Sequence, residues 1–119
     1  MSSEFKAQYD FESRINESSR IREKYEARVP IIVTRSKTEK VIPEITRRKF
    51  LVPKDLSMAQ FMYVIRKRIQ LSSDKSLYLF VGDANNLVPS SKTIGQIDYD
   101  HRDDDGYVYI QYSGESTFG

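Results

Sequence analysis

The sequence predicts a two-layer α+β fold, in which one long amphipathic helix packs across a four-strand mixed sheet. Two observations predict it. Four short segments are rich in β-branched and aromatic residues and end at turn residues, which is typical of strands. One longer segment, residues 55–71, repeats apolar side chains at helical spacing. The helix follows the second strand, and a single helix can cover one face of such a sheet.

Size and composition allow one domain with a modest core. The chain has 119 residues, of which 39% are hydrophobic, and it contains no cysteine. Disulfides and thiolate chemistry are therefore excluded. The apolar runs VPIIV and LYLFV are too short to cross a bilayer, and the polar segment MSSEFKAQYD does not resemble a signal peptide. We expect a cytoplasmic protein whose membrane association comes through an anchor or a partner.

The net charge of +2 is unevenly distributed along the chain. Residues 1–68 hold 16 Lys and Arg against 9 Asp and Glu, a net +7, whereas residues 69–119 hold 3 against 8, a net −5. This asymmetry suits a protein that orients toward charged partners. The basic triplets at 47–49 and 66–68 raise nucleic acid as a candidate, but acidic residues are abundant and no nucleic-acid motif is visible. We expect no nucleic-acid partner.

Residues 10–28 predict a helix, because they lack glycine and proline and because Asp10 suits an N-cap. The apolar residues in this segment are sparse, so the helix should lie on the surface of the core along a narrow stripe. The stripe would comprise Phe11, Ile15, Ile21 and Tyr25.

Residues 28–35 and 47–53 predict two strands joined by a polar connection, as in an antiparallel hairpin with a long loop. Pro30 weakens one edge of the first strand, because proline has no N–H to donate. In the long helix, Ser57 and Gln60 form a capping box. Its buried face would comprise Met58, Phe61, Met62, Ile65 and Ile69.

The second half of the chain predicts two further strands, at 76–82 and 107–113. Between them we expect a loop at 83–91, a short helix or turn at 92–98 and a solvated acidic turn at 101–106. The last strand alternates, with Val108 and Ile110 on one face and Tyr107 and Tyr109 on the other. This order is that of the ubiquitin β-grasp fold, although two-layer folds of other orders stay open.

An enzyme requires a nucleophile, a base or a metal site, and the sequence predicts none of these. His101 is the single histidine and completes no Ser/His/Asp set. Asp103, Asp104 and Asp105 lack the ligand and glycine spacing of a calcium loop, and the five glycines are too scattered for a phosphate loop. We predict a protein that is not an enzyme and that holds no cofactor and no metal.

The predicted strand KFLVP carries large apolar side chains on both faces, with Phe50 and Val52 on one and Leu51 on the other. A sheet covered by one helix should be polar on its second face. The N-terminal helix could cover that face, but its thin apolar stripe should leave part of it open. An open strand edge beside apolar pockets suits pairing with an extended peptide, and nearby cations favour acidic flanks on that peptide.

Several segments together resemble the GABARAP-like autophagy modifiers, ubiquitin-like proteins attached to phosphatidylethanolamine. They are FESR, IREKYEARVPIIV, RRKFLVPKDLSMAQFMYVIRKRIQL, SLYLFV and DDDGYVYIQYSGESTFG, and the resemblance covers residues 5–119. It implies a ubiquitin-like β-grasp core at 27–112. Two additional N-terminal helices, the first at 3–8, would form a helical extension at 1–26. A flexible conjugation tail would follow at 113–119.

The resemblance implies a chemical role for the end of the sequence. In this family an activating enzyme adenylates the terminal glycine and holds it as a thioester. A conjugating enzyme then passes it to the lipid amine, and a cysteine protease removes the lipid again. Gly119 would be the acyl donor and Phe118 the aromatic residue before it. A residue without Cβ can thread a narrow channel, and the two acyl chains of the lipid would anchor the protein to autophagosomal or vesicle membranes.

The resemblance also implies a dock for the aromatic-x-x-aliphatic motifs of cargo receptors and adaptors. Arg28 would meet acidic flanks, and a second docking face would lie around Tyr78 and Phe80. Gly106-Tyr107 stands where GABARAP itself has two phenylalanines, so the rim of the aromatic pocket should differ. The aromatic pocket would comprise Glu17, Ile21, Pro30, Ile32, Lys49, Leu51 and Tyr107. The aliphatic pocket would comprise Phe50, Val52, Pro53, Leu56, Phe61 and Val64.

Two alternative functions stay open. One is a polyanion-binding or cytoskeleton-linking adaptor that uses the basic half of the chain. It predicts steep salt dependence and indifference to Gly119. The other is an unconjugated ubiquitin-like interaction module, which would bind peptides without forming a lipid product.

Overall fold

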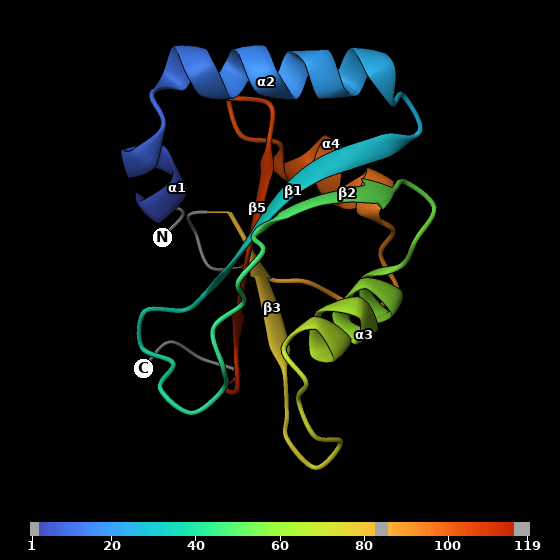
Figure 1. Ribbon diagram of the computed structural model, residues 1–119. Helices are drawn as coiled ribbons and strands as arrows, with labels where there is room; N and C mark the ends of the chain where they lie inside the picture. Colours follow the sequence, from blue (N-terminus) through green and yellow to red (C-terminus); the bar gives the residue numbers. More distant parts are fainter. Residues whose placement is uncertain (1–2, 83–85, 116–119) are drawn as a thin grey trace.

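A mixed sheet with the strand order β2-β1-β5-β3-β4 forms the centre of the fold (Figure 1). The computed structural model describes residues 3–82 and 86–115. β1 and β5 run parallel, and the other three pairs are antiparallel. The strands are β1 (Arg28–Arg35), β2 (Lys49–Pro53), β3 (Tyr78–Val81), β4 (Asn86–Leu87) and β5 (Val108–Ser113).

The predicted mixed sheet is confirmed, but it has five strands rather than four. β4 lies within the segment predicted to be a loop, where Asn86 pairs with Val81 and Leu87 with Phe80. A strand of two residues is too short for alternation to be visible in the sequence, so only its pairing with β3 identifies it.

Helices lie on both sides of this sheet (Figure 1). α3 (Met58–Arg68) and α4 (Ile94–His101) share one side, and α1 (Ser3–Gln8) and α2 (Phe11–Lys24) lie on the other. The capping box that opens α3 is confirmed: the Gln60 amide donates to Ser57 Oγ at 3.1 Å, and the Ser57 amide donates to Gln60 Oε1 at 2.9 Å. The two N-terminal helices are also confirmed.

The two sides of the sheet have cores of different size. The alternation predicted for the last strand is confirmed, because Val108 and Ile110 join the larger core and Tyr107 and Tyr109 the smaller one. The larger core also takes Val29, Ile31 and Val33 from β1, Phe61 and Ile65 from α3, and Ile94 and Ile97 from α4. The smaller core consists of Phe5, Ile32, Tyr107 and Tyr109.

The short helix or turn predicted at 92–98 is a helix that continues to His101. It begins with a second capping box, formed by Thr93 and Gln96. Because α4 ends at His101, this residue lies in the last turn of the helix rather than in the acidic turn that follows.

α2 begins where predicted, because Asp10 Oδ1 accepts a hydrogen bond from the Ser13 amide at 2.8 Å. The predicted apolar stripe is wrong at Phe11 and Tyr25, which are exposed, whereas Ile15 and Ile21 are half-buried. The buried residues of α2 are Arg14 and Ser18, whereas Phe11 is 50% exposed. Their partner is Asp105, which is fully buried, so the predicted solvated acidic turn is wrong at this residue.

The connection between β1 and β2 is ordered by one buried carboxylate. Glu39 is 7% exposed and accepts hydrogen bonds from the amides of Val41 and Ile42 at 2.9 and 2.8 Å. A further amide, that of Gly114, donates to it at 2.7 Å from the end of β5. Burial alone would raise the pKa of Glu39, but these hydrogen bonds outweigh it and lower the pKa to about 2.

The described residues contain neither a membrane-spanning helix nor a metal-binding cluster. Within residues 3–82 and 86–115, no helix has the length and apolar content needed to span a bilayer. The same residues contain no cluster of three or more His, Asp or Glu side chains that could hold a metal ion.

The buried charge of Glu39 predicts a defined pH dependence of stability. Because its pKa falls from the ordinary 4.5 to about 2 on folding, its stabilisation should be complete above about pH 5 and disappear toward pH 2. The quantity to compare is the free energy of unfolding of the wild type minus that of Glu39→Gln. This difference should be larger at neutral pH than at pH 2 by on the order of 3 kcal/mol. Urea unfolding at several pH values measures this difference, in which the other carboxylates cancel. A difference that stayed constant with pH would contradict the prediction.

Candidate functional site

β2 is an outer strand, and the described part of the chain places no further strand beside it. The Val33 amide donates to the Arg48 carbonyl at 2.8 Å, which fixes the alternation of the antiparallel pair. Lys49 and Leu51 therefore direct their main-chain groups away from β1. The Leu51 carbonyl accepts one bond at its open side, from Arg28 Nη1 at 3.3 Å. This edge can pair with an extended peptide once the exposed Arg28 side chain moves aside.

The residues predicted for the aromatic pocket come from α2, β1, β2 and the position directly before β5. Lys49 Nζ donates to Glu17 Oε1 at 2.8 Å, and the Tyr107 hydroxyl donates to the same oxygen. Ile21 lies one turn beyond Glu17 on the same face of α2. The structure thus brings Glu17, Lys49 and Tyr107 into direct contact, although they are far apart in the sequence.

Burial divides these residues into a floor and a rim. Ile32 and Tyr107 are fully buried and Pro30 is buried beside them, so they can only support a ligand from below. The others, Glu17, Ile21, Lys49 and Leu51, keep accessible surface. The tyrosine that was expected to change the rim therefore changes the floor, where its hydroxyl holds Glu17.

The charges of this cluster are set by its hydrogen bonds. Burial would raise the pKa of Glu17, but the bonds from Lys49 and Tyr107 lower it, so the carboxylate stays ionised. Burial and the neighbouring carboxylate raise the pKa of Tyr107, which therefore remains a hydrogen-bond donor. The rim thus presents a fixed carboxylate paired with a half-exposed ammonium group.

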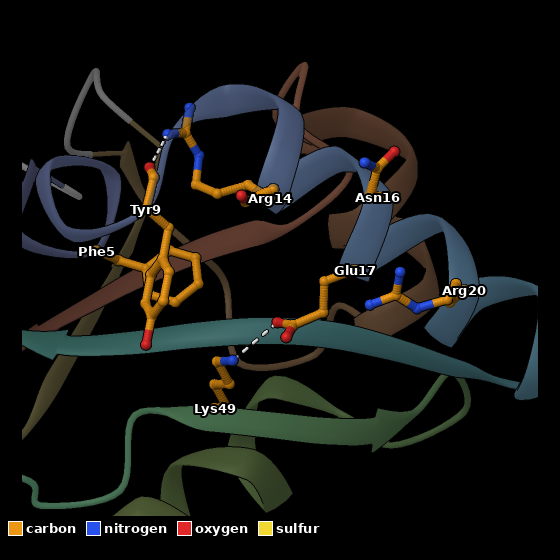
Figure 2. Close-up of a pocket in the computed structure, with 8 residues that line it drawn as sticks. Phe5, Tyr9, Arg14, Asn16, Glu17, Arg20 and Lys49 are labelled. Carbon is orange, nitrogen blue, oxygen red and sulfur yellow. Dashed lines mark hydrogen bonds and ion pairs between the residues drawn. The ribbon is translucent and has the colours of Figure 1, made fainter.

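A crevice of about 350 Å³ between α1 and α2 opens next to this cluster (Figure 2). The Phe5 ring meets the Tyr107 ring edge to face at 5.4 Å, and Lys49 Nζ lies 5.5 Å from the ring centres of both Phe5 and Tyr9. Sequence reasoning missed this crevice, because α1 has no periodic pattern. Its lining comprises Phe5, Tyr9, Ser13, Arg14, Asn16, Glu17, Arg20 and Lys49.

The residues predicted for the aliphatic pocket lie on the α3 side of β2. The rings of Phe50 and Phe61 meet edge to face at 5.5 Å, and the Arg68 guanidinium lies 5.1 Å above Phe50. Phe61 and Val52 belong to the larger core at 1% and 4% exposure, so they can only form the floor of this predicted pocket. Val52 is buried because it faces α3. Accessible apolar surface remains on Phe50, Pro53, Leu56 and Val64.

The predicted second docking face has little accessible surface at one of its two residues. Phe80 is only 3% exposed, whereas Tyr78 is half-buried. A binding role for Tyr78 stays a prediction.

Polar contacts fix α2, and with it Glu17 and Ile21, relative to the sheet. Arg14 Nε donates to Asp105 Oδ2 at 2.8 Å, and Ser18 Oγ donates to the Asp105 carbonyl at 2.5 Å. Further along the helix, Arg22 forms two bonds to the buried Asp98, at 3.0 and 2.7 Å. Gly106 allows this close approach, because a Cβ there would lie 2.2 Å from Ser18 Oγ and the residue has a φ of +89°.

The residues predicted for conjugation, Phe118 and Gly119, lie outside the described residues. The last described residues are Gly114 and Glu115, directly after β5.

Comparisons with known proteins agree with this architecture. A family model described as "Autophagy protein Atg8 ubiquitin like" matches residues 13–119. Autophagy-related protein 8 of Candida glabrata is 47% identical over 119 residues, covering 100% of this chain and 98% of that protein. Autophagy-related protein 8e of Arabidopsis thaliana is 49% identical over 115 residues, covering 97% and 92%. The crystal structure of ATG8 from Trypanosoma brucei matches with a TM-score of 0.86 and 39% identity over 97% of each chain.

The buried hydroxyl of Tyr107 should contribute to stability. Tyr107→Phe removes one hydrogen bond to a charged group, so the free energy of unfolding should fall by about 1.5–3 kcal/mol. Urea unfolding measures it. Tyr99→Phe is the matched control, because Tyr99 is 90% exposed and should cost almost nothing. Equal effects of the two substitutions would contradict the assignment.

Proposed function

Because the chain belongs to the Atg8 family of ubiquitin-like autophagy proteins, we propose that it is a modifier conjugated through Gly119 to phosphatidylethanolamine on autophagic membranes. In this role it recruits cargo receptors and adaptors that carry aromatic-x-x-aliphatic motifs. The similarity of nearly the whole chain to Atg8 proteins supports both parts of the proposal. The open edge of β2 is the observation on which the recruiting role rests.

The spacing of the motif fits the geometry around β2. In an extended peptide, two residues three positions apart point to opposite faces. A motif paired along Lys49 and Leu51 would therefore direct its aromatic residue toward the α2 side and its aliphatic residue toward the α3 side. The α2 side offers the Glu17 and Lys49 rim above Ile32 and Tyr107, and the α3 side offers Phe50 and its apolar neighbours.

Charge around the edge favours a peptide with acidic flanks. The Arg28 guanidinium has to leave the Leu51 carbonyl when a peptide strand takes that acceptor. It is then available to a carboxylate of the peptide, and the two exposed cations at Arg47 and Lys49 lie at the other end of the strand. Such contacts chiefly speed association and set specificity.

The conjugation part of the proposal assigns the chemistry to other proteins. In an activating enzyme the Gly119 carboxylate would attack the α-phosphate of ATP and release pyrophosphate, and the enzyme's thiolate would then displace AMP to give a thioester. After transfer to a conjugating enzyme, the lipid amine would displace the thiolate and leave an amide. A cysteine protease would later hydrolyse that amide. The chain itself would supply only the acyl group and the surfaces that these enzymes recognise.

Conjugation can be tested by incubating the protein with its activating and conjugating enzymes, ATP and liposomes containing phosphatidylethanolamine. The wild type should form a lipid product that moves faster on urea gels, and a form lacking Gly119 should form none. If the wild type stays unmodified but still binds motif peptides, the protein is an unconjugated interaction module and the conjugation proposal fails.

Docking at β2 can be tested with Leu51→Ala. Loss of this partly exposed side chain at the centre of the strand should weaken binding of an aromatic-x-x-aliphatic peptide by roughly 1–3 kcal/mol. Fluorescence anisotropy measures it, with Val41→Ala as the control, because Val41 is 75% exposed and outside β2. Unchanged affinity would place the site elsewhere. Steep salt dependence without peptide selectivity would favour the polyanion-binding adaptor.

A further inference from the structure

Glu39 lies in the connection between β1 and β2, yet half of its hydrogen bonds come from the end of β5. Its Oε2 accepts from the amides of Val41 and Ile42. Its Oε1 accepts from the Gly114 amide at 2.7 Å and from Ser113 Oγ at 3.3 Å. One side chain therefore joins this connection to the first residue beyond the sheet.

The carboxylate takes the place of a backbone acceptor. The Ser36 amide donates to the Tyr112 carbonyl at 2.9 Å, which continues the parallel β1–β5 ladder. In a regular parallel ladder, the Gly114 amide would next donate to the Ser36 carbonyl. That carbonyl instead accepts from the Glu39 amide at 3.1 Å. Glu39 supplies the missing acceptor, so Gly114 stays fixed at the point where β1 turns away.

The fit around Gly114 leaves little room for a side chain. A Cβ on Gly114 would lie 2.9 Å from Ile42 Cδ1 and 3.2 Å from Glu39 Oε1. Ile42 is itself buried in the larger core at 4% exposure, so it has little room to retreat. Residues 39–42 and 114 thus form one packed unit.

This unit requires a carboxylate rather than an amide. Each oxygen of Glu39 accepts two hydrogen bonds, and three of the four donors are backbone amides. A glutamine has one acceptor oxygen, and its NH₂ group would face donors. Hydrogen bonds to a charged acceptor are also about twice as strong as neutral ones.

We propose that Glu39 is a positioning residue for conjugation: it holds Gly114 and so sets where, and in which direction, the C-terminal segment leaves the domain. The inference rests on the conjugation proposed above. The activating enzyme has to recognise the domain and the terminal carboxylate together, and a fixed departure point reduces the conformations that must be lost on binding. In this proposal Glu39 acts through Gly114 and has no part in the chemical step.

The test measures the steady-state kinetics of thioester formation on the activating enzyme. Glu39→Gln should raise KM roughly three- to tenfold and leave kcat nearly unchanged, because the reacting group is intact. Gly114→Ala should raise KM similarly through the clash with Ile42 and Glu39. Glu44→Gln is the matched control, since Glu44 is an exposed glutamate in the same connection, and it should leave both constants unchanged.

A second control separates positioning from loss of stability. Ile65→Ala shortens a fully buried side chain of α3, an element separate from residues 39–42, and should destabilise the domain about as much as Glu39→Gln does. Its KM should equal that of the wild type. Affinity of the Glu39→Gln protein for a motif peptide should also be unchanged. Equal KM values for wild type and Glu39→Gln would overturn the inference and leave the proposed function intact. Failure of the wild type to form a thioester would overturn both.

Discussion

The buried ion pair between Arg14 and Asp105 is the interaction on which one whole side of the molecule depends. The Asp105 carboxylate is fully buried and also accepts hydrogen bonds from the Tyr107 amide and the Tyr109 hydroxyl. Removing one partner of such a pair typically costs about 3–5 kcal/mol, because the other charge is left buried and alone. That is comparable with burying one or two large apolar side chains, and the apolar core on this side is small. The position of α2 on the sheet therefore depends mainly on charged contacts, whereas the position of α3 depends on the burial of apolar side chains.

The candidate docking strand lies where these two kinds of packing meet. On the α2 side, the accessible groups are a carboxylate and an ammonium group above buried aromatic rings. On the α3 side, they are aromatic and aliphatic carbon atoms at the border of the larger core. A peptide on β2 would therefore meet a polar rim with one face and an apolar surface with the other. Opposite faces of one strand can then be selective for different side chains.

Features with a local pattern could be predicted from the sequence, and features made by distant pairs could not. The start of α3, the extent of β1 and the alternation of β5 depend on capping residues and on periods of two or 3.6 residues. The polar buried face of α2 and the burial of Asp105 depend on contacts across 91 positions of the chain, for which no local signal exists. The cluster of Glu17, Lys49 and Tyr107 joins three separate segments, so no local pattern predicts it. Only the family resemblance implied it. Glu39 had no signal at all, since a glutamate in a polar connection is usually solvated.

The fixed position of Gly114 has a consequence for a lipid-anchored form of the domain. Under the conjugation proposed above, residues 115–119 would connect it to the lipid, and five residues span at most about 18 Å. The shortest dimension of the domain is 24 Å. A tether shorter than the body that it holds does not let that body turn over above a surface. Under that proposal, the range of orientations that β2 can take above the membrane would be limited at Gly114, where the tether begins.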